Sequence, residues 1–356
     1  MSQRSADPGK VAQFATRVLQ DWGGAHIIAL AYIGDRLGIF RALADGVPMT
    51  SQDLADRTGL NERYIREWAA AMAASEYIDY NPRDHTFRLS PEQVAVLADD
   101  DSPRFMGGGF LYAQACVRQL PRLMEAFKNG GGIAFAEFGP EIVEAIQRLF
   151  APGYESAVAT QWLPALGEVF ERVKAGADVA EVGCGAGQAL IPFAKAYLNS
   201  RFVGYDIDEE SIRRARRHAA NADLGERVSF EFTAAEDIPH KGHFDLIIAF
   251  NCIHDMANPR GALAGVCRAL KPDGAFLWSE ANASDRLEDN INPMGRLLYA
   301  TSVMHCMTVS LAHGGEGLGN VVGEGTAREL AREAGFSHFE KLPVEHPYHQ
   351  LFLLEK

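Results

Sequence analysis

The stretch Glu181-Val-Gly-Cys-Gly-Ala-Gly187 decides the fold of this 356-residue chain. It begins in the last two residues of the strand-like segment DVAEV (178–182) and leads into the helix-like segment QALIPFAKAYL. Glycines at such a junction let the backbone turn tightly and approach a ligand, and the amides at the helix start favour an anionic group. A dinucleotide fingerprint has the spacing GxGxxG, but position 188 is Gln, so the motif is GxGxG after an acid. The spacing therefore points away from NAD.

Beyond this loop, strand-like and helix-like segments alternate along the chain. Such alternation predicts a parallel sheet with helices on both faces. The segments, in order, are RFVGYD (201–206), EESIRRARRHAANADL (209–224), VSFEFT (228–233), FDLIIAF (244–250), NPRGALAGVCRAL (258–270) and DGAFLWSEA (273–281).

Asp206 ends the second strand of this series, where a carboxylate can accept hydrogen bonds from both hydroxyls of a ribose. The alternative is that Asp206 only caps the next helix, a role that Asp208 could also fill. After the third strand, TAAEDIP offers the backbone of Ala234 and Ala235 and the side chain of Glu236 to an adenine edge. We therefore expect a cofactor that contains a nucleoside.

Together, EVGCGAG, RFVGYD, TAAEDIP and RALKPDGAFL resemble the successive motifs of class I S-adenosylmethionine-dependent methyltransferases. The resemblance covers about residues 155–356 and implies an α/β domain with a seven-stranded Rossmann-like sheet. The segments FEKLPVE and YHQLFLLEK can supply the hairpin that closes this sheet. It implies S-adenosyl-L-methionine as cofactor and S-adenosyl-L-homocysteine as product. Relatives often have Asp at the place of Ala234, so adenine would rely here on backbone amides and Glu236. The residues expected at the cofactor are Glu181, Gly183, Cys184, Gly185, Gly187, Asp206, Ile207, Ala234, Ala235, Glu236, Phe250 and Asn251.

Residues 1–100 are expected to form a mostly α-helical domain of the winged-helix type. Thr50 or Ser51 can cap one short helix, Gly59 ends it, and Asn61 can cap the next, while YIDYNPRDHTFRLS alternates around a turn as a wing does. A winged helix before such a catalytic domain resembles the two-domain small-molecule O-methyltransferases of plants and bacteria, including mycobacterial-type relatives. That resemblance implies that the module makes a homodimer.

Charge decides how this helix-turn-helix pattern is interpreted. The whole chain has 34 basic and 47 acidic residues, a formal charge of -13, and residues 1–100 have 10 against 14. Arg63 and Arg66 of the presumptive recognition helix are offset by Glu62 and Glu67. Because a phosphate-binding surface needs uncompensated cations, we expect no nucleic-acid partner. The alternative, a cofactor-sensing winged-helix transcriptional regulator, would need the isolated module to bind DNA.

Three features bear on location. No apolar run approaches the roughly 18 residues of a membrane helix, and the first twenty residues lack the pattern of a secretory leader. The cysteines contain no CxxC pair, are odd in number and favour reduced thiols, so we expect a cytoplasmic protein with no membrane partner. They are Cys116, Cys184, Cys252, Cys267 and Cys306.

The remaining segments are a helical connector over 101–175 and a catalytic domain over 176–356. In the connector, the GGG runs at 107–109 and 130–132 are interpreted as loops. Within the catalytic domain, a long insertion at about 281–325 is expected to cover the carboxyl ends of the strands. Its Met304, His305 and Met307 are candidates for an apolar acceptor pocket, although methionines in a helix also serve as core. No closed set of metal ligands is apparent, so no metal is expected.

After the fourth strand, AFNCIHDM places His254 and Asp255 where that O-methyltransferase group has a His-Asp pair, which the resemblance implies to be catalytic. A phenol with a pKa near 10 needs a proton acceptor at neutral pH, and a histidine is suited to that role. We therefore predict O-methylation of a small, hydroxylated aromatic or apolar acceptor, with in-line transfer and His254 as general base. The alternatives are N- or C-methylation with His254 only orienting the acceptor, or a His254 that merely packs at the strand end.

Overall fold

The computed structural model describes residues 6–356, apart from the side chain of residue 159. Residues 1–5, where the predicted first domain begins, lie outside the described residues. The chain divides into two compact units, one that ends at Gln114 and one that spans Ala115–Lys356. Each unit is described by itself.

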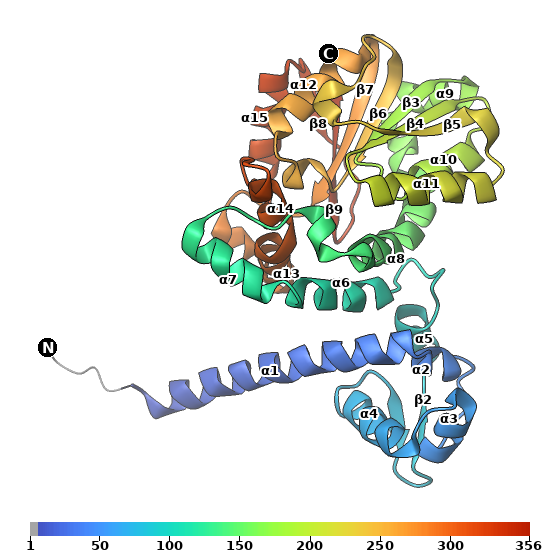
Figure 1. Ribbon diagram of the computed structural model, residues 1–356, viewed down its shortest axis with the longest axis vertical. Helices are drawn as coiled ribbons and strands as arrows, with labels where there is room; N and C mark the ends of the chain where they lie inside the picture. The colour runs from blue at the N-terminus through green and yellow to red at the C-terminus, as the bar shows by residue number, and fades with distance from the viewer. Residues whose placement is uncertain (1–5) are drawn as a thin grey trace, which may run out of the picture. The chain divides into compact units, whose positions relative to one another are not determined.

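The first unit is mostly helical, with a small antiparallel hairpin. Thr50 and Asn61 cap the two short helices of the predicted helix-turn-helix, and Gly59 ends the first of them with φ 70°. Arg63 pairs with Glu67 and Arg66 with Glu62, so this helix neutralises its own cations. The elements are α1 (Pro8–Arg36), α2 (Ile39–Ala42), α3 (Ser51–Thr58), α4 (Glu62–Ala74), β1 (Asp79–Asn81), β2 (Thr86–Arg88) and α5 (Pro91–Leu97) (Figure 1).

A run of helices connects this module to the sheet. The prediction of a loop at 107–109 is wrong, because these glycines form the first turn of helix α6. A Cβ at Gly107 would lie 2.3 Å from the ring of Phe105, so close packing explains the glycine there. The run at 130–132 is a loop, as predicted. The helices are α6 (Gly107–Val117), α7 (Leu120–Asn129), η1 (Phe135–Phe138), α8 (Pro140–Ala157), η2 (Val158–Trp162), η3 (Pro164–Leu166) and α9 (Glu168–Ala175).

The second unit contains the predicted seven-stranded sheet, in the order β5-β4-β3-β6-β7-β9-β8. The strands β3 to β7 are parallel. Strand β9 lies between β7 and β8 and is antiparallel to both, so the C-terminal segments form the predicted closing hairpin. Alternate side chains of β6 enter two separate apolar cores, with Leu246 and Ile248 on one face and Ile247 and Ala249 on the other. The strands are β3 (Asp178–Val182), β4 (Arg201–Asp206), β5 (Val228–Phe232), β6 (Phe244–Phe250), β7 (Leu270–Ala281), β8 (His338–Lys341) and β9 (His349–Glu355).

Helices cover both faces of this sheet, and Figure 1 shows α9, α10 and α11 apart from α12 and α15. The predicted insertion between β7 and α15 contains two short helices joined by a π-helical turn. In the described part of the chain, no helix combines the length and apolar character needed to cross a membrane. The elements are α10 (Leu190–Ala196), α11 (Glu209–Asn221), η4 (Gly225–Arg227), η5 (Ala235–Asp237), η6 (Ile253–Asp255), α12 (Pro259–Ala269), η7 (Leu287–Asn290), α13 (Pro293–Thr301), η8 (Ser302–Cys306), α14 (Met307–Ala312) and α15 (Glu324–Ala334).

Candidate active site

A cavity of about 380 Å³ opens at the carboxyl ends of β3, β4, β5 and β6. On the side of the strand ends it is lined by the glycine loop and by the segments that follow β4, β5 and β6. Across from the strand ends it is lined by residues of η1, α8 and α14. The predicted cofactor residues that line it are Gly183, Gly185, Asp206, Ile207, Ala234, Ala235, Glu236, Phe250 and Asn251.

The glycine loop after β3 forms a cradle that a larger residue would fill. Gly183 has φ 66° and Gly185 φ 51°, in the left-handed region that favours glycine. A Cβ on Gly183 would lie 2.6 Å from the side chain of Cys252, which follows β6. The two strand ends therefore meet with room for backbone only, and the loop leaves its outer surface free for a ligand.

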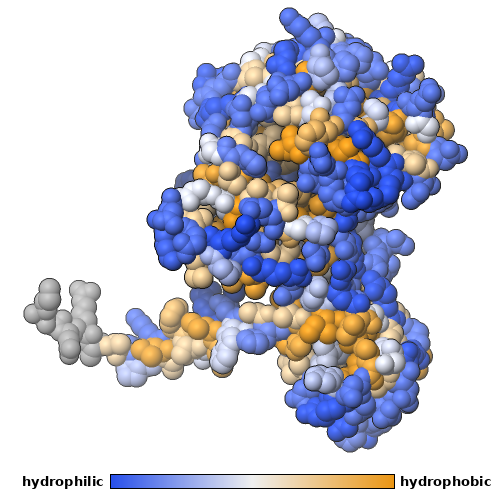
Figure 2. Space-filling model, in the orientation of Figure 1, coloured by the Kyte–Doolittle hydropathy of each residue, from blue (hydrophilic) through white to orange (hydrophobic). Residues whose placement is uncertain are grey.

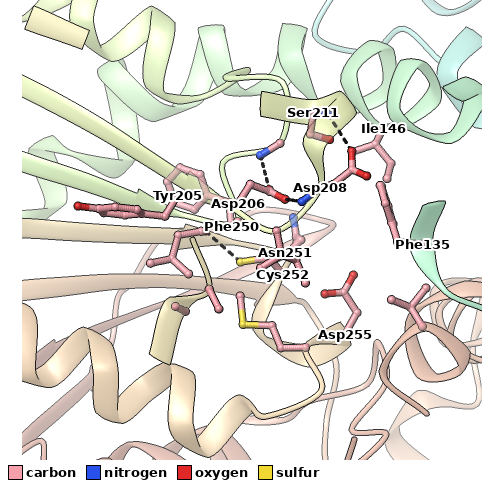
Figure 3. Close-up of a pocket in the computed structure, with 18 of the residues that line it drawn as sticks. Phe135, Ile146, Tyr205, Asp206, Asp208, Ser211, Phe250, Asn251, Cys252 and Asp255 are labelled. Atoms are coloured by element: carbon pink, nitrogen blue, oxygen red, sulfur yellow. Dashed lines mark hydrogen bonds between the residues drawn. The ribbon is translucent and has the colours of Figure 1, made fainter. Parts of the chain in front are cut away.

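Asp206 ties the end of β4 to this loop. Its carboxylate accepts hydrogen bonds from the backbone N–H of Gly185 at 2.8 Å and of Asp208 at 2.9 Å (Figure 3). Asp208 itself caps α11 by accepting from the N–H of Ser211 at 2.8 Å. The capping role is therefore filled by Asp208, and burial raises the pKa of Asp206, which lines the cavity, to about 6.

The segment after β5 forms the far end of the same cavity. Ala234, Ala235 and Glu236 line it, and the short helix η5 begins here. A Cβ on Gly265 of α12 would lie 2.2 Å from the carbonyl oxygen of Ala235, so α12 packs closely behind this turn. Ile207 lines the cavity with 62% of its surface exposed. An apolar side chain and backbone polar groups are thus available to a flat heterocycle.

Three residues that the resemblance implied at the cofactor, Glu181, Cys184 and Gly187, do not line the cavity. Glu181 points from β3 into the interior, where burial raises the pKa of its carboxyl well above the usual range. Its Oε2 atom has no hydrogen-bond partner among the described residues. Cys184 is 1% exposed, behind the loop.

Asn251 and Tyr154 form a polar junction at the end of β6. Asn251 has φ 52°, and its Nδ2 donates to the hydroxyl oxygen of Tyr154 at 3.0 Å and to Nδ1 of His349 at 3.1 Å. Burial raises the pKa of Tyr154 well above its usual value, so the hydroxyl keeps its proton. Since its oxygen accepts from Asn251, that proton is available to a ligand in the cavity, which Tyr154 lines.

Tyr154 and the other cavity residues of α8 were not singled out from the sequence. Their signal was an apolar series at helical spacing, which is equally typical of a helix that packs in the core. The series consists of Val143, Ile146, Phe150 and Tyr154.

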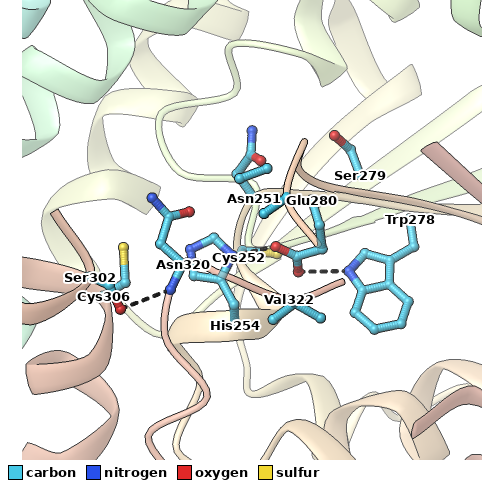
Figure 4. A network of polar contacts seen from close by, with 12 residues as sticks. Asn251, Cys252, His254, Trp278, Ser279, Glu280, Ser302, Cys306, Asn320 and Val322 are labelled. Atoms are coloured by element: carbon cyan, nitrogen blue, oxygen red, sulfur yellow. Dashed lines mark hydrogen bonds and ion pairs between the residues drawn. The ribbon is translucent and has the colours of Figure 1, made fainter. Parts of the chain in front are cut away.

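His254 and Asp255 point to different places from the short helix η6. His254 is 2% exposed and does not line the cavity; its Nδ1 is hydrogen-bonded to Oε2 of Glu280. The other oxygen of Glu280 accepts from Nε1 of Trp278 at 2.8 Å (Figure 4). Burial lowers the pKa of His254, but the charge of Glu280, with a contribution from Cys306, raises it well above the usual value. His254 and Glu280 therefore form a buried ion pair.

Asp255 is the member of the pair that reaches the cavity. Its carboxyl group points into the space that separates Asp206 from Phe135 (Figure 3). Burial, opposed by the charge of His254 and assisted by the charges of Glu280 and Asp206, raises its pKa to about 7. A carboxylate with a pKa near neutrality can accept a proton from a bound hydroxyl.

Replacing Glu280 by Gln is expected to lower the free energy of unfolding by about 3 kcal/mol near pH 6, because it breaks a buried pair. The folded-state pKa of His254 is raised, so the pair stabilises fully below about pH 6.5 and its contribution is lost as the pH rises through the folded-state pKa. Urea denaturation of both proteins between pH 6 and pH 10 measures this difference. Trp278→Phe, which removes the indole hydrogen bond and part of a buried ring but leaves both members of the pair, is the control and should show a destabilisation that does not depend on this pair's titration. A difference that grows with pH would contradict the ion pair.

The predicted acceptor residues of the insertion do not line the cavity. Met304, His305 and Met307 lie outside its lining, whereas Val309 and His313 of the same segment belong to it. His305 contacts the rings of Phe135 and Phe138, with centroids 5.7 and 4.8 Å away, and burial lowers its pKa to about 3. Among the described residues, no three His, Cys, Asp or Glu are grouped to hold a metal ion.

Family models match two separate segments of this chain. Residues 173–341 match the family model described as "Methyltransferase domain", and residues 25–99 match an "Rv2258c-like winged HTH domain". A ubiquinone biosynthesis O-methyltransferase of Thiobacillus denitrificans is 31% identical over 110 residues, which are 30% of this chain and 46% of that relative. The match thus spans less than half of the relative's length.

Two solved structures share the fold over nearly the whole chain. An O-methyltransferase-like protein of Nostoc punctiforme, described only as putative, superimposes with a TM-score of 0.72 at 17% identity and covers 99% of this chain and 100% of its own. Human N-acetylserotonin methyltransferase, solved in complex with S-adenosylmethionine, gives a TM-score of 0.67 at 19% identity and covers 100% and 99%. At these identities the likeness concerns the fold alone.

Proposed function

We propose that this chain, which carries a methyltransferase domain and an Rv2258c-like winged HTH domain, transfers a methyl group from S-adenosylmethionine to an oxygen atom of a small molecule. One observation supports the proposal: a single cavity is lined by the glycine loop and Asp206 on one side and by an apolar wall on the other, and the Asp255 carboxyl points into it. Methyl transfer needs cofactor and acceptor in one water-poor space, aligned with each other.

The residues present fit the cofactor. Gly183 and Gly185 leave room for its methionine part, Asp206 retains lone pairs for the ribose hydroxyls, and the turn at Ala234 and Glu236 suits the adenine. When bound, S-adenosylmethionine supplies an electrophilic methyl group on a sulfonium, and S-adenosylhomocysteine is the product. Calorimetry with S-adenosylmethionine, followed by transfer of a labelled methyl group to a panel of phenols, tests the activity. Failure of the chain to bind the cofactor would refute it.

We place the proton acceptor at Asp255 rather than at the predicted His254. The Nδ1 atom of His254 is engaged by Glu280, and its ring lies outside the cavity lining, whereas the Asp255 carboxyl faces the cavity. In this proposal Asp255 accepts the proton of the acceptor hydroxyl. The pair of His254 and Glu280 fixes η6 and thereby positions Asp255.

The proposed partner, besides the small-molecule acceptor, is a second copy of this chain. Helix α1 carries an apolar stripe that no other described part of the chain covers (Figure 2). Its members recur at the spacing of a coiled-coil seam, and the opposite face carries Gln13, Arg17 and Gln20. The exposed members are Val11 (53%), Phe14 (68%), Val18 (51%) and Trp22 (64%). A self-complementary stripe of this kind suits two copies of the same helix.

The double substitution Val18→Asp with Trp22→Asp is expected to convert the homodimer to a monomer, because it places two charges on each side of the apolar seam. Sedimentation velocity at micromolar concentration measures the mass. The pair Gln13→Asp and Gln20→Asp, on the opposite face of the same helix, is the matched control and should remain dimeric. A dimeric seam variant, or a monomeric wild type, would overturn the proposal.

We propose a cytoplasmic location and no nucleic-acid partner. None of the five cysteines, all of which lie in the described part of the chain, forms a disulfide bond, and this supports a reducing compartment. The cations of α4 are engaged by Glu62 and Glu67, which supports a winged helix that does not bind phosphates.

A further inference from the structure

The cavity has an apolar wall across from the strand ends. Helix α8 presents one face to it with residues three or four positions apart, and one residue each from η1 and α14 extends this face. The wall is thus built from segments that are far apart in the sequence but belong to the same unit. Its residues are Phe135, Val143, Ile146, Phe150, Tyr154 and Val309. Such a wall suits a ring system.

The polar groups beside this wall are neutral: the hydroxyl of Tyr154 can donate a hydrogen bond, and Oδ1 of Asn251, which has no partner among the described residues, can accept one. Tyr154 keeps its hydroxyl proton because burial raises its pKa, and its orientation is set by the 3.0 Å hydrogen bond from Asn251. Asn251 is in turn held by His349, whose pKa burial lowers to about 3. A hydroxyl and an amide can orient a polar substituent on a ring, but neither can neutralise a charge.

The charged groups of the cavity are of one sign. Its lining includes the carboxyl groups of Asp206, Asp208, Glu236 and Asp255, whereas no lysine or arginine occurs among the described residues that line it. The one histidine of the lining, His313, is exposed at the edge. An acceptor with a carboxylate or phosphate group would place its charge near Asp255, with no cationic side chain in the described lining to pair with it.

We propose that the acceptor subsite takes ring-sized, apolar molecules that are neutral or cationic, and that Asp255 excludes anionic ones. This inference rests on the proposed function and adds the substrate class to it. Asp255 then has two effects in the same place: it accepts the hydroxyl proton, and it repels acceptors that carry a negative group elsewhere on the ring. Carboxylic acids, which are ionised at neutral pH, are accordingly expected to bind this subsite weakly.

Three para-substituted phenols of nearly equal size test the charge rule: 4-ethylphenol is neutral, tyramine is cationic and 4-hydroxyphenylacetate is anionic. Their dissociation constants are measured by ligand-observed NMR on the full chain saturated with S-adenosylhomocysteine, at pH 8.5, where Asp255 is ionised. We expect 4-ethylphenol and tyramine to bind at least tenfold more tightly than 4-hydroxyphenylacetate. Asp255→Asn should reduce that ratio to threefold or less, with little change for 4-ethylphenol.

Two further variants distinguish the effect of the Asp255 charge on binding from the effect of apolar contact and from the effect of a charge elsewhere. Phe150→Ala should weaken all three phenols alike, because it removes part of the wall and no charge. Glu316→Gln removes one negative charge outside the cavity lining and should leave the ratio unchanged. Equal or tighter binding of the anion, or no detectable binding of 4-ethylphenol, would overturn the inference. Calorimetry of S-adenosylhomocysteine on the same samples keeps the two proposals apart: if it binds and the anion is not excluded, only the charge rule fails.

Discussion

Asp255→Asn is expected to lower kcat/KM for a neutral phenol by about 10²- to 10⁴-fold, because it removes the proton acceptor from the cavity. The dissociation constant of S-adenosylmethionine should change less than threefold, since the cradle is formed by other residues. Release of S-adenosylhomocysteine measures the turnover, and calorimetry measures the binding. The matched variant His254→Gln should lose stability and no more than about tenfold in kcat/KM. A folded His254→Gln protein as inactive as Asp255→Asn would return the role of base to His254.

The pH profile gives the same prediction a second readout. Burial raises the pKa of Asp255 to about 7, and only the ionised carboxylate accepts a proton. In the wild type, kcat/KM should therefore rise about tenfold per pH unit below pH 7 and level off above it. The charged groups that act on the pKa of Asp255 are His254, Glu280 and Asp206. Asp255→Asn should remove this rise, and a persistent rise would assign it to another group.

Asp206→Ala is expected to raise the dissociation constant of S-adenosylmethionine by at least about 100-fold. Two hydrogen bonds from ribose hydroxyls to a carboxylate are together worth about 3 kcal/mol, which corresponds to that factor. The amides of Gly185 and Asp208 also lose their acceptor, so the loop becomes less ordered. Calorimetry measures the affinity.

Asp245→Ala is the control for this substitution. Asp245 lies on β6 and holds the N–H of Asp178 at 2.9 Å and Nζ of Lys271 at 2.7 Å, away from the cavity lining. The Asp245→Ala substitution should lower the free energy of unfolding without weakening the binding of S-adenosylmethionine. If Asp206→Ala bound S-adenosylmethionine as the wild type does, the ribose would have to lie elsewhere.

The cofactor half of the cavity could be predicted because its determinants are local. A glycine loop at the end of a strand and an acid at the end of the next strand must meet in a parallel sheet, wherever the rest of the chain lies. Gly183, Gly185 and Asp206 all line the cavity for this reason. Turn and capping residues predicted two further features in the same way, the hairpin of β1 and β2 and the helix cap at Asn61.

The acceptor half depends on contacts between distant segments. His254 and Asp255 are neighbours in sequence, and the partner that turns His254 inward, Glu280, lies on the next strand of the sheet. The π-helical turn at 302–306 changes the rotation per residue, so a face assigned at ordinary helical spacing does not continue through it. Met304 and Met307 were chosen by residue type, and residue type alone does not distinguish them from Val309, which the fold brings to the cavity.

A crystal structure of the chain with S-adenosylhomocysteine tests the central claim most directly. We expect the ribose hydroxyls on Asp206, the homocysteine part over Gly183 and Gly185, and the sulfur atom open to the space between Asp255 and the wall of α8. His254 should remain paired with Glu280, out of contact with the ligand. A ligand whose sulfur faces His254, or one that binds outside this cavity, would contradict the account.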